Sequence, residues 1–142
     1  MLERLNENEQ RALMELMVYM AKADGRVEEV EAILLEQYAG IFAMDLTELE
    51  GDFGPEELAP HFDSPESRII VLQELLRLAH LNGVFNTDEQ SAMLEVASLL
   101  GVPLDLLREV ETWVVEGIQW TLRGEKLLEK GREVVRVNPS AG

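Results

Sequence analysis

A short turn motif that occurs twice, 58 residues apart, constrains this chain more than any other feature. The first copy reads Ala-Asp-Gly-Arg-Val-Glu-Glu-Val-Glu over residues 23–31, and the second reads Leu-Asn-Gly-Val-Phe-Asn-Thr-Asp-Glu over residues 81–89. Apolar residues before and after each motif also correspond at the same spacing. We interpret the pair as one helix–turn–helix unit that the chain uses twice.

Each copy predicts a helix, a tight turn and a second helix. An apolar stripe with the i, i+3, i+4, i+7 spacing of a one-sided helix precedes the first turn: Leu13, Leu16, Met17, Met20 and Ala21. Gly25 and Gly83 then stand where a left-handed residue can end a helix, because glycine accepts a positive φ without steric cost. Asn86 is a good N-cap for the next helix, and Glu89 follows three residues later, as in a capping box.

The pattern Ala-x-x-Asp-Gly-x-Val-x-x-x-Glu, followed by a helix and repeated once, resembles the tellurite-resistance TerB-like family. The residues that carry the resemblance are Ala21, Asp24, Gly25, Val27 and Glu31, then Ala79, Gly83 and Glu89. The resemblance covers roughly residues 9 to 120. It implies an all-helical domain of about seven helices whose two turns lie close together, a metal-binding acidic cluster, and a role in stress-response or membrane-associated complexes. In the second copy, Asn82 takes the place of the Asp.

The two turns carry the candidate cation site. A single turn is not an EF-hand, since Met20 and Lys22 occupy the first two ligand positions of that loop and calcium needs six to eight oxygens. A site shared between the turns is the open alternative, because clustered carboxylates repel and a hard cation relieves that repulsion. Its ligands would be Asp24, Glu28 and Glu31 from one turn and Asn82, Asp88 and Glu89 from the other. The ion would be calcium, magnesium or manganese. The other interpretation makes Glu31 and Glu89 helix caps and leaves the rest as solvated surface.

The formal charge of -16 is unevenly distributed. Residues 24–66 hold 13 acidic residues and one basic residue, whereas residues 123–142 hold five basic and three acidic residues. An acidic surface repels phosphates, so we expect no nucleic-acid binding. It suits a cation or a basic protein partner, although acidity also serves solubility alone.

Several classes of site lack their residues in this sequence. There is no Cys, and the two His have no metal-ligand spacing, so zinc and thiolate sites are not expected. No Gly-x-Ser-x-Gly motif or Gly-rich phosphate loop occurs, and we therefore predict no enzymatic activity. No segment approaches the roughly 18 apolar residues of a membrane span, and the acidic start does not read as a signal peptide. We expect a cytoplasmic protein.

The predicted architecture is a single all-α domain over residues 1–124, with a short helical insert at 44–65, and a basic tail over 125–142. Helices are expected at 9–23, 28–42, 65–81, 87–100 and 103–122, with Gly124 ending the last one and a single helical turn at 125–130. We expect Val30, Ile33 and Ile41 to face inward, together with Leu34, Tyr38 and Phe42. Trp113 and Trp120 share one helix face and are expected in core or semi-buried packing; the alternative is a partner-binding stripe.

The leading functional interpretation is a non-enzymatic, acidic TerB-like binding module, related to tellurite resistance or stress response, with a weak divalent-cation site between the two turns. The alternative is a metal-free interaction domain that binds a basic protein partner or self-associates into a homo-oligomer.

Overall fold

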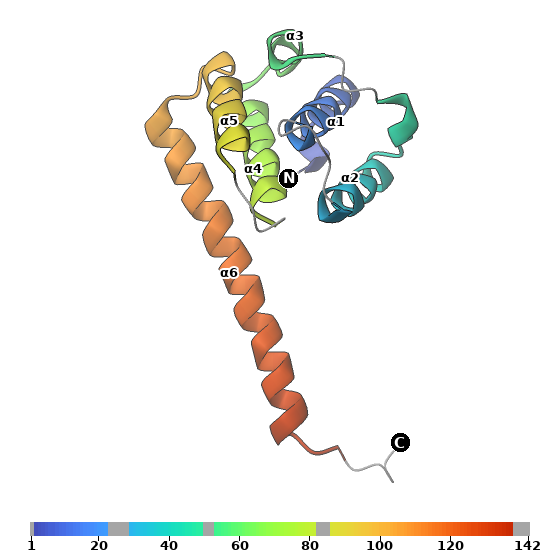
Figure 1. Cartoon of the computed structure of the whole chain (residues 1–142), viewed down its shortest axis with the longest axis vertical. Coiled ribbons are helices and arrows are strands. Elements are labelled where there is room, and N and C mark those ends of the chain that lie inside the picture. Colours follow the sequence, from blue (N-terminus) through green and yellow to red (C-terminus); the bar gives the residue numbers. More distant parts are fainter. Residues whose placement is uncertain (1, 23–28, 50–52, 82–85, 138–142) are drawn as a thin grey trace.

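The computed structural model describes residues 2–22, 29–49, 53–81 and 86–137, and these residues form helices without a strand. Six α-helices follow one another in this described part of the chain (Figure 1): α1 (Glu7–Ala21), α2 (Glu29–Ile41), α3 (Pro55–Leu58), α4 (Pro65–Leu81), α5 (Thr87–Leu99) and α6 (Leu104–Val134). Short 3-10 turns lie at Leu2–Arg4, Leu46–Glu48 and Ala59–His61. The predicted all-α class is confirmed, whereas the count of about seven helices is not.

Local capping explains where these helices begin. Asn6 accepts a hydrogen bond from the Glu9 N–H at 2.8 Å, and its own N–H donates to Glu9 Oε1 at 3.1 Å, which completes a capping box at the start of α1. The predicted cap of α5 is confirmed, since Asn86 Oδ1 accepts from the Glu89 N–H at 2.8 Å. Ser64 Oγ accepts from the Ser67 N–H at 3.0 Å at the start of α4.

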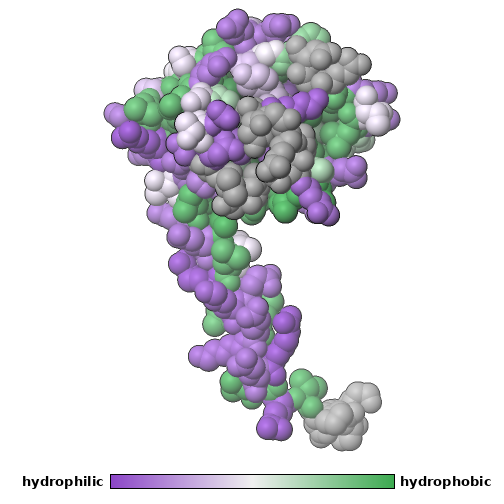
Figure 2. Space-filling view, viewed as in Figure 1, coloured by the Kyte–Doolittle hydropathy of each residue, from purple (hydrophilic) through white to green (hydrophobic). Residues whose placement is uncertain are grey.

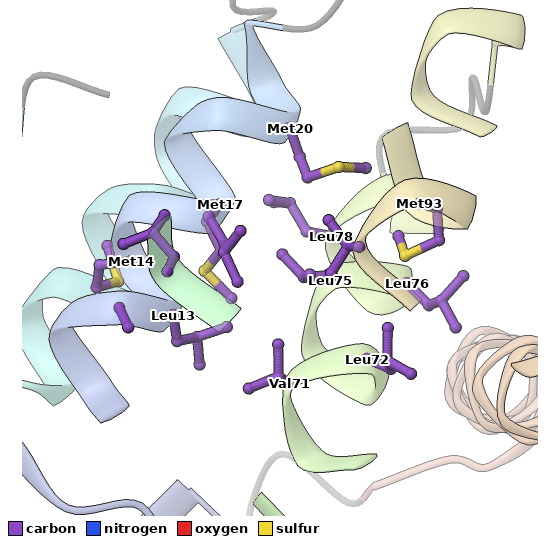
Figure 3. Packing of buried hydrophobic residues seen from close by; sticks show 14 of the residues in the cluster. Leu13, Met14, Met17, Met20, Val71, Leu72, Leu75, Leu76, Leu78 and Met93 are labelled. Carbon is purple, nitrogen blue, oxygen red and sulfur yellow. The ribbon is translucent and has the colours of Figure 1, made fainter. Parts of the chain in front are cut away.

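The core lies mainly between α1 and α4, with α5 packed against both. Figure 3 shows Leu13 and Met17 of α1 on the side that faces Val71 and Leu75 of α4. The α1 stripe predicted from the sequence is confirmed, because each of its members is buried. We call the packed helices α1 to α5 the body. Burial of these apolar side chains supplies most of its stabilisation, at roughly 25 cal/mol for each Å² removed from water.

The insert between α2 and α4 is docked on the body. Phe62 is fully buried and Leu58 nearly so, while Phe53 is half exposed. Arg68 ties the insert to the end of α5, since its guanidinium donates to the Phe62 carbonyl at 3.1 Å and to the Leu100 carbonyl at 2.8 Å. The insert is therefore a packed connection between α2 and α4.

The inner face of α2 agrees with the predicted one only in part, since Tyr38 is buried as predicted and Leu34 and Phe42 are half-buried. Val30, Ile33 and Ile41 are 48–64% exposed, so their predicted inward orientation is wrong. The buried residues of α2 are Glu31, Leu35, Tyr38 and Ala39. The buried stripe, which includes Tyr38, is less hydrophobic than the exposed one, which includes Ile33. A polar contact of Tyr38 with α4 accompanies its burial.

The last helix is longer than predicted. Gly124 lies inside α6, which continues to Val134, so both the predicted stop at Gly124 and the separate turn at 125–130 are wrong. A glycine in a helix interior costs only about 1 kcal/mol relative to alanine, which good helix formers on both sides can offset. Figure 1 shows the second half of α6 projecting away from the other helices.

Candidate functional site

At each of the two turns (called corners below), the helix that follows carries a buried glutamate, and the two glutamates occupy equivalent positions. Glu31 is the third residue of α2 and is 2% exposed, and Glu89 is the third residue of α5 and is 3% exposed. Asp88, beside Glu89, is exposed. The remaining predicted ligands, Asp24, Glu28 and Asn82, lie outside the described residues. The corner glycines and Val27 and Phe85 lie there as well.

The described residues do not by themselves assemble the predicted cation site. Within residues 2–22, 29–49, 53–81 and 86–137, no group of three or more His, Asp or Glu side chains is placed to hold a metal ion. A carboxylate in the first turn of a helix is favoured by the positive end of the helix dipole. Both buried glutamates satisfy that condition, which fits the interpretation that they cap their helices.

A buried pair that the sequence analysis missed joins α2 to α4. The Tyr38 hydroxyl donates a hydrogen bond to Glu74 Oε2, and both residues are buried. Burial raises the pKa of the Tyr38 phenol, and the nearby negative charge of Glu74 raises it further. The phenol is therefore held as a proton donor. A Glu inside the apolar run of α4 was the available signal, since a buried carboxylate needs a partner.

His80, which the sequence places beside the second corner, points to α6 instead. Its Nε2 lies 3.1 Å from Glu111 Oε2, and both side chains are partly exposed. Leu107, Val110 and Val114 are buried on the same stretch of α6, which packs on α4. The first half of α6 is thereby anchored to the body.

The two tryptophans of α6 are both exposed, so the expectation of core or semi-buried packing is wrong. Trp113 is 45% exposed and Trp120 is 72% exposed. The face of α6 that packs on α4 is the one with Leu107, Val110 and Val114, and the tryptophans lie beside that face rather than on it. Leu127 and Val134 are also exposed, at 69% and 68%. Figure 2 shows apolar side chains along the projecting part of the helix.

Five exposed apolar residues of α6 lie on a seam with alternating spacings of four and three, which three glycines complete together with Val110, buried at its edge. The seam consists of Leu106, Val110, Trp113, Gly117, Trp120, Gly124, Leu127, Gly131 and Val134. An average spacing of 3.5 residues is the pattern of a helix that pairs with another helix in a coiled coil. The heptad spacing was visible in the sequence, but the expected helix stop at Gly124 concealed it.

A hollow of about 450 Å³ lies beside this seam, between the end of α4 and α6. Arg77 and Leu81 line it from α4, and Trp113, Gly117 and Trp120 line it from α6. The hollow and the seam form one continuous, mainly apolar surface.

The apolar seam does not make α6 a membrane span, since no described helix is both long and apolar enough to cross a bilayer. Comparison with known proteins adds no identification: the chain matches no protein-family model, no curated protein and no solved structure.

Proposed function

We propose that the chain is a non-enzymatic protein-interaction module that binds another protein chain through the seam of α6. The observation that supports the proposal most is the exposure of Trp120, Leu127 and Val134 on one face of a helix that projects from the body. Exposed aromatic anchors of this kind typically contribute most of the binding energy of an interface. A helix in water without a packed face is also only marginally stable, and docking stabilises it.

The test uses a photo-crosslinking amino acid placed on α6 of the full chain in living cells. With the photo-crosslinker at Leu127, on the seam, we expect a covalent adduct to a protein. The matched control places it at Gln119, which is exposed on the opposite face of the same helix. Adducts from neither position, or equal adducts from both, would contradict the proposal. The mass of the adduct tells a second copy of this chain from a different partner.

A second candidate function is the TerB-like cation module. The observation that favours it is the burial of Glu31 and Glu89 at the same position of two corners whose sequences correspond. Buried carboxylates that approach one another would gain from a hard cation. This function and the interaction module do not exclude each other.

Thermal melting with EDTA, calcium, magnesium or manganese tests the cation module. An ion at a hundred times its Kd stabilises the native state by about 2.7 kcal/mol. The gain should disappear in Glu31→Gln and in Glu89→Gln, and it should persist in Glu66→Gln, whose side chain is 77% exposed. An unchanged melting temperature at millimolar ion would leave the chain as a metal-free interaction module.

A further inference from the structure

We propose that the occupant of the α6 seam is α6 of a second copy of this chain, packed in the antiparallel direction. This inference rests on the proposed role of α6 as a docking surface and names the partner. The argument uses the sizes of the seam residues, the charges beside the seam and the space above its glycines.

From Trp113 onward, the seam alternates large side chains with glycines, whereas before it Val110 is buried in its own copy. Leu106, Trp113 and Trp120 are the large residues at one position of the heptad, and Gly117, Gly124 and Gly131 occupy the other position. An added Cβ at any of the three glycines would meet nothing within 4 Å, so no contact within one copy fills the space above them. The glycines therefore form open sockets on the surface of a single copy.

Helix direction decides how such residues meet. A layer of the interface consists of one seam residue from each helix. In an antiparallel pair the two residues of a layer come from different heptad positions, whereas in a parallel pair they come from the same position. The parallel arrangement would place Trp120 on Trp120 and Gly117 on Gly117, so that its layers would be alternately overfilled and empty. The antiparallel arrangement places a large residue on a glycine in every such layer, which gives the even packing that a coiled-coil interface needs.

One antiparallel register places a large side chain over each of the three glycines. If Trp120 lies on Gly117 of the second copy, then Trp113 lies on Gly124 and Leu106 lies on Gly131 of that copy. The large residues are all available, since Leu106, Trp113 and Trp120 are 37%, 45% and 72% exposed. The second helix would also cover the hollow beside Leu81.

The charges beside the seam select the same register. Glu109, Glu116, Arg123 and Lys130 follow at heptad spacing on one flank, and each is exposed. In the register described, Glu116 lies beside Arg123 of the second copy, and Glu109 lies beside its Lys130. A shift by one heptad in either direction would bring Glu116 beside Glu116 or Arg123 beside Arg123. Like charges at such positions destabilise a pair, and opposite charges set partner and orientation.

Sedimentation equilibrium of the full chain tests the pairing through its charges. We expect a reversible dimer of twice the 16.0 kDa chain mass. Glu116→Arg and Arg123→Glu should each weaken dimerisation by about tenfold or more, and the double exchange should restore it. The matched control is Lys126→Glu, which makes the same charge change as Arg123→Glu on an exposed site of the opposite face and should leave the dimer unchanged. Failure of the double exchange to restore the dimer would overturn the antiparallel register.

The sockets are tested independently with Gly124→Leu, which fills the space proposed for Trp113 of the second copy. Leucine favours helix more than glycine does, so α6 should gain helicity by circular dichroism while dimerisation weakens by about tenfold or more. Gln119→Leu is the control on the opposite face. A dimer unaffected by Gly124→Leu, or a chain that stays monomeric at every concentration, would refute self-pairing. Binding of the monomeric chain to anionic vesicles or to a different protein would also refute it; only the latter would leave the proposed function standing.

Discussion

Removal of the Tyr38 hydroxyl is the most direct test of how α2 is held on the body. In the Tyr38→Phe variant, the ring still fills its place, but the Glu74 carboxylate loses the hydrogen bond that the phenol donates to it. Glu74 is 3% exposed, so water has little access to replace the donor. The variant thus isolates one buried polar contact from the packing around it.

The expected loss follows from the type of bond. A hydrogen bond to a charged acceptor contributes about 1.5–3 kcal/mol to stability, and a buried acceptor left without its donor keeps its desolvation penalty. With a urea m-value of about 2 kcal/mol/M, a loss of 2 kcal/mol lowers the midpoint by about 1 M. Tyr19→Phe is the matched control, since Tyr19 is only half-buried; its cost should stay within about 0.5 kcal/mol.

The same pair predicts a dependence on alkaline pH. Burial and the charge of Glu74 raise the pKa of Tyr38 in the folded chain, so the folded state holds the phenolic proton more tightly than the unfolded state does. That contribution is complete below the ordinary tyrosine pKa of about 10 and is lost at about 1.4 kcal/mol per pH unit above it. The stability advantage of the wild type over Tyr38→Phe should therefore shrink as pH rises from 9 to 11. Tyr19 is present in both proteins and cancels in the difference.

Urea titrations of the full chain at pH 7, 9, 10 and 11 provide the measurement. The double variant Tyr38→Phe with Glu74→Met removes both polar groups, and a coupling of at least about 1 kcal/mol is expected between the two sites. A cost of Tyr38→Phe below about 0.5 kcal/mol at pH 7, or a pH-independent difference, would refute the reasoning.

Two further predictions concern the ends of helices. Glu9 is buried; burial raises its pKa, but hydrogen bonds from the Asn6 and Asp63 N–H groups and from Ser67 outweigh that effect, so the pKa lies below the usual 4.5. Glu9→Gln should cost about 1–2 kcal/mol at pH 7, and the difference in urea titrations should fade as pH falls below about 4, because stability from a lowered pKa is lost in acid. Gly101 has φ +72° after α5, and an added Cβ would make only an ordinary contact, with Arg68 Nη1 at 3.8 Å. Gly101→Ala should cost about 1–2 kcal/mol in thermal melts. Gly40→Ala lies in the last turn of α2, where an added Cβ would meet nothing within 4 Å, and should stabilise by about 0.5–1 kcal/mol; the same sign at both sites would contradict the backbone argument.

Helix positions were largely predictable because their signals are local. Asn86 and the Ser64-Pro65 pair start their helices by side-chain or backbone preferences that need no distant partner. Gly101 ends α5 in the left-handed conformation for the same kind of reason. Gly124 shows the limit of such rules. Gly101 ends a helix, whereas Gly124 lies inside one, and only the neighbouring residues determine whether the helix continues.

The inward faces and the candidate sites depend on distant partners, and sequence rules predicted them less well. On α2, the predicted burial of Tyr38 is confirmed, but its partner Glu74 lies on another helix, and Ile33, which was also predicted to face inward, is exposed. On α6, the body ends before the helix does, which leaves Trp120 in water although its type favours burial. The cation site remains a prediction, because Asp24, Glu28 and Asn82 lie outside the described residues.

Oxidation of the buried methionines would report how often the core opens transiently. Met14, Met17, Met20 and Met93 have at most 3% of their surface in contact with water, and the chain has no cysteine to compete for a mild oxidant. Their thioethers can then react only in molecules that have transiently opened, so the oxidation rate follows the population of open forms. Each sulfoxide would leave a polar group in the core, on α1 or α5, and would oppose its closing again.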